Sequence, residues 1–417
     1  MGILEIQNLR FPKKILITLL FINIHQSKED IMLKKGFKFI DLFSGIGGFH
    51  QAMKFFGGEC VFASEIDKDA IQVYFNNYKI DSSNDITLVD EKEIPFHDVL
   101  CAGFPCQAFS KAGKQNGLND TRGTLFFDIE RILKFHKTKY IILENVRNLT
   151  SHDHGRTWQI IQENLKKIGY RLTEKPLLLS PHQFGIPQIR ERVFILGVFD
   201  PDNIELPLTI EFDKLLHKKE NDIYSILDMK GDFSQYKISE YEEKVLNIWN
   251  DFYDGIHEKT LGFPIWLDYF MIKPEEDMPN WKKEIIYKNN SLFLNNKHFI
   301  EKWLKKYNYL MEIKPTHRKF EWQAGDSINS LWDGVIQFRP SGIRVKKPDV
   351  FPALVAIVQI PIIGKFKRRL TPNECSKLQS FPDDFVFSEN KQQAYKQFGN
   401  SVNVEILKNI VMKLMNE

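Results

Sequence analysis

The 417-residue chain contains only four cysteines, and their spacing excludes two kinds of protein. They form no CxxC pair of the kind that holds structural zinc, and they are too sparse for a disulfide framework. We therefore expect a protein of a reducing compartment, the cytoplasm, with no metal site. The four residues are Cys60, Cys101, Cys106 and Cys375.

The chain also lacks an apolar run long enough to cross a membrane. The nearest candidate, Ile15–Ile24, has ten residues, whereas a spanning helix needs about 20. Two lysines precede this run, but no small-residue cleavage site follows it, so a signal peptide is not indicated. We interpret residues 1–35 as an amino-terminal extension and expect the functional chain to begin at Met32.

A large excess of charge of one sign is absent as well, since the formal net charge is +3. A polyanionic partner is permitted, but it would have to meet a local basic surface. Two segments could supply one: the cluster in 365–369 and the lysine-rich, aromatic-rich stretch 282–319. Either segment could instead be an ordinary solvated face.

Regular structure is predicted most clearly between residues 37 and 199. Short apolar runs alternate there with helical spacing, which predicts an α/β domain with a doubly wound, mostly parallel sheet. At 417 residues the chain is long enough for this domain and either a second domain or an insertion. Strands are expected at 60–64, 97–105, 140–146 and 190–199, and helices at 48–57, 68–78 and 124–136.

The alternation stops after residue 200 and returns near the carboxyl end. Residues 201–365 are rich in aromatics, Asn and Lys without a clear period, so we expect an inserted, irregular domain. In 366–417, Thr371 as N-cap, Pro372 and Glu374 predict a helix start. A last amphipathic helix is expected at 403–415, after a turn at Gly399-Asn400.

A glycine turn follows the first predicted strand, at Gly45, Gly47 and Gly48. Glycines between a buried strand and a helix let the backbone approach a ligand at the helix N-terminus. The next strand ends in Glu65, where a carboxylate can accept hydrogen bonds from ribose hydroxyls. Together these features favour a cofactor that contains adenosine, although a tight turn without a ligand would also explain the glycines.

Cys106 follows Pro105 directly after another predicted strand. Proline neither continues a helix nor donates to a central strand, so Cys106 lies where the strand ends, at the edge where α/β proteins bind ligands. Glu144 ends a second strand at the same edge, where a carboxylate is either solvated or serves a polar ligand. Cys106 is therefore either a buried packing residue or a nucleophile with Glu144 as its acid.

Arg190 and Arg192 alternate at the start of a further predicted strand, so we expect both on one face. They could anchor the Glu144 carboxylate, hold an anion, or lower the pKa of Cys106. Ordinary surface arginines are the alternative.

An ordered series of motifs in the chain resembles the bacterial cytosine-5 DNA methyltransferases of type II restriction–modification systems. The resemblance covers residues 37–199 and 366–414, and residues 201–365 correspond by position to the variable target-recognition domain of that family. A Thr-Leu pair that is usual late in that domain has Ala353-Leu354 as its counterpart here. The motifs are FIDLFSGIGGFHQA, ASEID, GFPCQAFS, LENV, PQIRERVFILG, RRLTPNECSKLQSFPD and QFGNSVNVEI.

The resemblance implies transfer of a methyl group from S-adenosylmethionine to carbon 5 of a flipped-out cytosine in a specific duplex DNA sequence. It makes Cys106 the nucleophile, with Glu144, Arg190 and Arg192 as its companions on the base. It also suggests that the polar, glycine-rich segment 111–124 closes over that base. The residues that it assigns to S-adenosylmethionine are Phe43, Gly45, Gly47, Glu65, Ile66, Asp85, Ile86, Pro105, Asn400, Ser401 and Val402.

The same resemblance implies double-stranded DNA as the partner, a cognate restriction endonuclease without a stable complex, a monomer, and no membrane. A tRNA cytosine-5 methyltransferase on the same scaffold is the main alternative, which the long insert disfavours. A non-catalytic DNA-binding module would be expected to have lost Cys106 or the cofactor motif, and an oxidoreductase would leave Cys106 and Glu144 without a role. The recognition sequence itself cannot be derived from residues 201–365.

Overall fold

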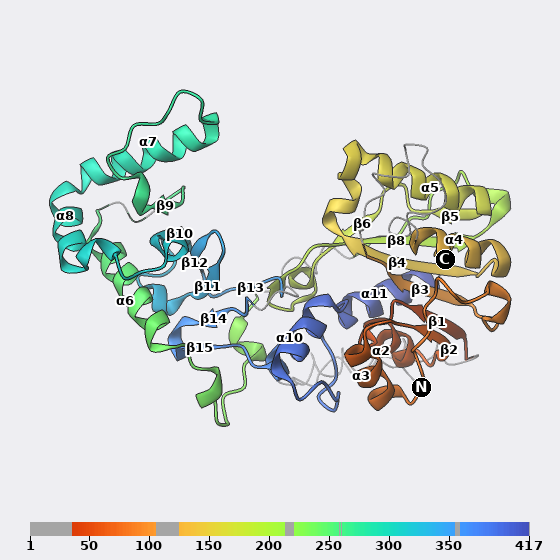
Figure 1. Ribbon diagram of the computed structural model, residues 1–417. Helices are drawn as coiled ribbons and strands as arrows, with labels where there is room; N and C mark the ends of the chain where they lie inside the picture. Colours follow the sequence, from red (N-terminus) through yellow and green to blue (C-terminus); the bar gives the residue numbers. More distant parts are fainter. Residues whose placement is uncertain are drawn as a thin grey trace, which may run out of the picture.

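The computed structural model describes residues 36–105, 125–212, 221–257, 259, 261–354 and 359–416. The described chain forms two lobes, each built around its own sheet (Figure 1). The extension expected at 1–35, the nucleophile Cys106 and the loop expected at 111–124 all lie outside the described residues.

The first lobe is built on a seven-stranded sheet of order β2-β1-β3-β4-β8-β5, with β6 also paired to β8. The pairs among β1 to β4 are parallel, and β8 is antiparallel to β4, β5 and β6. Of the described strands in this sheet, β8 alone therefore runs against the others, and the predicted mostly parallel sheet is confirmed. The strands are β1 (Lys38–Leu42), β2 (Glu59–Ser64), β3 (Val99–Gly103), β4 (Tyr140–Val146), β5 (Tyr170–Leu172), β6 (Leu177–Leu179) and β8 (Arg192–Phe199).

Helices cover both faces of this sheet, as the doubly wound prediction requires. Successive strand residues point to opposite faces, so Phe39 joins one hydrophobic cluster and Ile40 another. The Phe39 cluster includes residues of α2 (Gly48–Phe55), α3 (Lys68–Tyr78) and α11 (Val404–Leu414). The Ile40 cluster includes residues of α4 (Leu125–His136) and α5 (Arg156–Ile168). Burial on both faces explains why these strands are apolar throughout.

The second lobe contains regular structure, so the expectation of an irregular domain in 201–365 is wrong. It has a six-stranded sheet of order β15-β14-β11-β12-β10-β9 and a core of its own. Three of its six strands have only two residues, too few for alternation to be visible in the sequence, and the other three have five each. Its elements are α6 (Glu240–Gly255), β9 (Ile265–Trp266), α7 (Asn280–Asn295), α8 (Lys297–Lys306), β10 (Lys319–Gln323), β11 (Val335–Arg339), β12 (Gly342–Lys346), β14 (Ile362–Ile363) and β15 (Arg368–Arg369).

Between the lobes, two short strands from distant parts of the chain pair with each other. β7 (Gln188–Ile189) lies just before β8, and β13 (Phe351–Pro352) lies between β12 and β14 of the second sheet. They pair in parallel, and Phe351 donates its backbone N–H to the carbonyl of Pro187 at 2.7 Å. Figure 1 shows β13 between the two lobes.

The basic cluster in 365–369 is only partly at the surface: Lys365 and Lys367 are exposed, and Arg368 is buried. Arg368 is 3% exposed and forms an ion pair with the fully buried Glu374 at 2.7 Å. Lys367 and Arg369 form ion pairs with Glu243 and Glu242 of α6. The interpretation of Arg368 as a surface charge is therefore wrong.

The helices of the carboxyl-terminal segment agree in part with prediction. α9 (Pro372–Leu378) begins with the predicted capping box, in which Thr371 and Glu374 satisfy each other's backbone N–H. α11 begins after its N-cap Asn403, as expected. Gly399-Asn400 is not a turn, because both residues end a further helix, α10 (Lys391–Asn400).

Candidate active site and cofactor pocket

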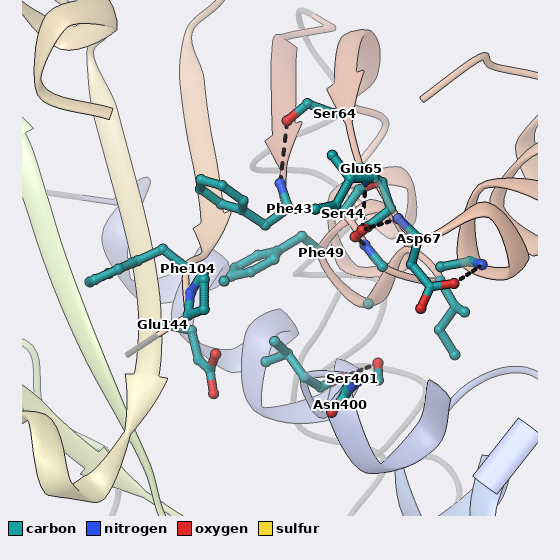
Figure 2. Close-up of a pocket in the computed structure, with 18 of the residues that line it drawn as sticks. Phe43, Ser44, Phe49, Ser64, Glu65, Asp67, Phe104, Glu144, Asn400 and Ser401 are labelled. Atoms are coloured by element: carbon teal, nitrogen blue, oxygen red, sulfur yellow. Dashed lines mark hydrogen bonds between the residues drawn. The ribbon is translucent and has the colours of Figure 1, made fainter. Parts of the chain in front are cut away.

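A cavity of about 560 Å³ lies at the carboxyl edge of β1 to β4. Polar and apolar side chains reach it from the strand ends and from α10 (Figure 2). Of the described residues that the sequence assigned to cofactor or catalysis, all but Gly47 line it. These residues are Phe43, Gly45, Glu65, Ile66, Asp85, Ile86, Pro105, Glu144, Arg190, Arg192, Asn400, Ser401 and Val402.

The glycine turn shapes one wall of this cavity. Gly45 and Gly47 have φ angles of 53° and 89°, which glycine adopts at no steric cost. A Cβ at Gly45 would meet no atom within 4 Å, so the backbone there is open to a ligand, whereas one at Gly47 would lie 2.3 Å from the ring of Tyr78. Gly47 therefore allows α2 to pack closely, and it does not line the cavity.

Three backbone N–H groups fix the Glu65 carboxylate at the wall of the cavity. Its Oε2 accepts from Gly45 at 2.8 Å, and its Oε1 accepts from Ile66 at 2.8 Å and Asp67 at 2.9 Å (Figure 2). A carboxylate has about four accepting positions, so one more donor can bind. The geometry fits the expected hydrogen bond from a ribose hydroxyl.

Other features of the cavity also suit an adenosine-containing cofactor. Ile66 is 74% exposed beside the partly buried Phe43, which leaves apolar surface at the rim. The buried hydroxyl of Ser44 and the buried amide of Gln397 line the cavity, and neither has a hydrogen-bond partner among the described residues. Because buried polar groups normally have partners, these two fit polar atoms of a bound molecule. Sequence reasoning missed both, although each is next to or near a motif residue.

The carboxyl-terminal segment completes the cavity from the opposite side. A Cβ at Gly48 would lie 2.8 Å from the carbonyl oxygen of Val402, so the glycine turn and the segment after α10 touch. Lys396 of α10 adds an ion pair to Asp67 at 2.7 Å. The glycine turn and the carboxyl-terminal segment therefore meet at this cavity, although more than 300 residues separate them in the chain.

Glu144 lies at the end of β4, directly opposite Gly103 of β3. It is 9% exposed, and its Oε1 lies 3.0 Å from Nε of Arg192. Burial raises the pKa of Glu144, and the charges of Arg192 and Arg190 oppose that rise. The carboxyl group therefore holds a proton to a higher pH than usual while its orientation is fixed by Arg192.

Arg190 and Arg192 have different partners, although both line the cavity. β8 begins at Arg192, and the Arg190 guanidinium is 2% exposed. It donates to the carbonyl oxygens of Leu354 and Gly399 at 2.7 Å each, and to that of Ser401 at 2.9 Å. Burial lowers the pKa of Arg190 to about 9, so the group is still charged at neutral pH.

The described residues contain no cluster of three or more His, Cys, Asp or Glu side chains able to hold a metal ion. They also contain no helix of the length and apolarity that crossing a bilayer requires. The chemistry of the cavity is thus that of a buried acid, two arginines and unpartnered polar groups.

Curated proteins similar to this chain are bacterial type II methyltransferases. M.HgiCI from Herpetosiphon aurantiacus is 36% identical over 422 residues, which cover 90% of this chain and 97% of the relative. M.AluI from Cellulosimicrobium cellulans is 33% identical over 477 residues, covering 90% and 91%.

A solved structure of the S. pombe methyltransferase Dnmt2 superposes with a TM-score of 0.52 at 18% identity, and covers 91% of this chain and 98% of that one. A mutant of DNMT2 from Spodoptera frugiperda gives a TM-score of 0.53 at 21% identity, with 91% and 99% covered. These structures support the fold. The model of the C-5 cytosine-specific DNA methylase family matches residues 37–416. The chain therefore belongs to this family: it is a DNA (cytosine-5-)-methyltransferase that uses S-adenosylmethionine.

Proposed function

We propose that the chain methylates one cytosine in a specific duplex sequence through a covalent adduct with Cys106, within a restriction–modification system. The observation that supports this role best is the position of Glu144. It is buried, it is held by Arg192, and it lies across from Gly103, three residues before Cys106 in the chain. Pro105, the described residue before Cys106, lines the same cavity.

The chemistry explains why a thiol and a buried carboxyl group are needed together. Carbon 5 of cytosine is too weak a nucleophile to take a methyl group directly. Addition of the Cys106 thiolate to carbon 6 makes the ring an enamine, whose carbon 5 is nucleophilic. Bound S-adenosylmethionine supplies the activated methyl group. Loss of the proton on carbon 5 and expulsion of the thiolate then release 5-methylcytosine.

Glu144 acts on the opposite edge of the base. With its pKa raised by burial, the carboxyl group can donate a hydrogen bond to ring nitrogen 3 and accept one from the exocyclic amine. Arg192 keeps this group in place through its bond at 3.0 Å. Because carbon 6 is inaccessible inside a duplex, the base has to be flipped into the cavity.

S-adenosylmethionine would be held by the residues that surround the glycine turn. Glu65 would accept from the ribose and Asp85-Ile86 would face the adenine, beside the apolar surface of Phe43 and Ile66. Asn400, Ser401 and Val402, with the unpartnered Ser44 and Gln397, would meet its amino-acid end.

We assign recognition of the DNA sequence to the second lobe, because the motif series stops in 201–365 while an independent core persists there. The relatives are named type II methyltransferases, which supports a partner restriction endonuclease in the same system. We propose that the enzyme acts as a monomer on DNA in the cytoplasm.

Two experiments test the proposal. Bisulfite sequencing of DNA from cells that express the chain should reveal 5-methylcytosine at one recurring sequence. A duplex with 5-fluorocytosine at that position should then trap the enzyme, since fluorine does not leave as a proton does. With cofactor present, the wild type should form a denaturation-resistant adduct and Cys106→Ala should not. An adduct in the alanine variant would refute the role of Cys106.

A further inference from the structure

The buried guanidinium of Arg190 joins three segments that lie far apart in the sequence. Arg190 itself lies between β7 and β8. Its guanidinium donates hydrogen bonds to the backbone carbonyl oxygens of Leu354, Gly399 and Ser401. Leu354 is 1% exposed and lies two residues after β13, in the segment that joins β12 to β14 of the second sheet. Gly399 and Ser401 lie at the end of α10 and line the cofactor cavity.

The contacts of Arg190 make both segments costly to displace. The carbonyl groups at the end of α10 carry the negative end of the helix dipole and have no partner within the helix. Charge-assisted hydrogen bonds to them are stronger than neutral ones. The Nε of Arg190 already lacks a hydrogen-bond partner among the described residues, so loss of another acceptor would leave a buried charge further unsatisfied.

Other contacts also hold together the segments that Arg190 joins. β7 pairs with β13, which places Phe351 opposite Gln188. The side chain of Gln188 accepts from Gln379 at 3.0 Å, and the carbonyl of Gln379 accepts from the backbone of Val404. The segment between β12 and β14 and the cofactor segment are therefore both tied to residues 188–192, the part of the chain that contains Arg190 and Arg192.

We propose that Arg190 is a positioning residue that couples cofactor binding to DNA binding, and that it does not act on the base. Because Arg190 can donate to all three carbonyl groups only when both segments are in place, a ligand that fixes one segment favours the arrangement of the other. This inference rests on the proposed assignment of DNA recognition to the second lobe. The coupling must be reciprocal, since the two ligands share one thermodynamic cycle.

Calorimetry on the full-length protein tests the coupling. The affinity for S-adenosylmethionine is measured with and without a duplex that carries the sequence mapped by bisulfite sequencing. In the wild type, the duplex should tighten cofactor binding about 5- to 150-fold, the usual range of allosteric coupling. In Arg190→Lys, whose single ammonium group lacks the fork of the guanidinium, the factor should fall below about 3-fold. Absence of coupling in the wild type would overturn the proposal.

Steady-state kinetics separate positioning from action on the base. Arg190→Lys should raise KM for the cofactor at least about 10-fold and keep kcat within about 3-fold, because only binding interactions are lost. A fall of kcat by about 100-fold at saturating cofactor and DNA would instead place Arg190 on the base and overturn the proposal.

A matched control distinguishes a specific loss of coupling from a general loss of stability. Arg147 forms a largely exposed ion pair with Glu191, the residue next to Arg190 in the chain, and Arg147→Lys should keep the wild-type coupling factor. If Arg190→Lys lowers only the Tm and leaves coupling and KM unchanged, Arg190 is merely structural. If the wild type methylates no DNA, the proposed function fails as well. Normal methylation with unchanged coupling in Arg190→Lys refutes this inference alone.

Discussion

The two lobes differ in the charged side chains that they bury. The first lobe encloses Asp41, Glu130, Glu144 and Arg190, each less than a tenth exposed. Among the described residues from 240 to 363, the polar side chains that are buried to this degree are the amides Asn289, Asn296 and Gln337. A buried charge is costly, and such charges gather where chemistry needs a shifted pKa.

The cores of the two lobes differ as well. Aliphatic residues are the majority in the cores of both lobes, but the core of the second lobe also contains stacked pairs of aromatic rings. Trp249 stacks on Phe320 with ring centroids 4.9 Å apart, and Tyr253 stacks on Trp322 at 3.6 Å. A core whose buried charge is confined to the paired Arg368 and Glu374 at the edge of its sheet suits a scaffold that presents loops for binding. The comparison agrees with the proposed division of the chain into a lobe for chemistry and a lobe for recognition.

The largest effect is expected when the nucleophile is replaced and both lobes are otherwise left unchanged. Cys106→Ser should lower kcat by at least about 10³-fold, because serine adds poorly to carbon 6. Its affinities for the cofactor and for DNA should stay within about 3-fold of the wild type, since neither site loses a binding group. Radiolabelled methyl transfer and calorimetry give the two readouts. Near-normal transfer by the serine variant would disprove the mechanism.

Exchange of the second lobe with that of a relative should move methylation to the relative's sequence and leave cofactor affinity unchanged. The exchanged segment should extend through Arg369, because β15 pairs with β14. Bisulfite sequencing reports the site. A hybrid joined at residue 365 splits this pair of strands and should melt a few degrees lower. Methylation at the original sequence in a folded hybrid would contradict the assignment.

Two matched core substitutions should destabilise different lobes. Leu407 of α11 and Leu331 of the second lobe are both fully buried, so truncation of either to alanine should cost about 2–5 kcal/mol. Leu407→Ala should also weaken cofactor binding, because α11 packs on α2 behind the glycine turn. Leu331→Ala should leave that affinity within about 2-fold. Equal losses of cofactor affinity would show that the lobes are not independent.

Truncation after Phe387, which removes α10 and α11, should abolish cofactor binding.

The smallest effect concerns a buried carboxyl group of the first lobe. Asp41 is fully buried, and burial raises its pKa well above its ordinary value of 3.8. Its stabilising contribution is therefore complete below that value and is lost as the pH rises through the raised folded-state pKa. Asp41→Asn, neutral throughout, should lose less stability than the wild type between pH 4 and pH 8. Denaturant unfolding across this range measures the difference, and parallel pH profiles would contradict the prediction.

Local signals in the sequence determined most of the first lobe. α3 at Lys68–Tyr78 and β4 at Tyr140–Val146 have the predicted bounds, because apolar periodicity is contained within each element. The capping box of α9 depends on residues three apart, so it too could be predicted. Glu65 and Glu144 could be recognised as site residues because each follows a buried strand, where a carboxylate requires a partner.

Only the tertiary structure decided the features that depend on distant segments. The sheet of the second lobe pairs strands from distant parts of the chain, three of them only two residues long, and the reversal of β8 leaves no mark on its apolar sequence. The partners of Arg190 are backbone carbonyl groups, which every residue possesses and no side-chain pattern reveals. Arg368 is buried because Glu374 reaches it through the fold of α9 onto β15. A sequence encodes which groups are costly to bury, and the packing of distant segments decides which partners they receive.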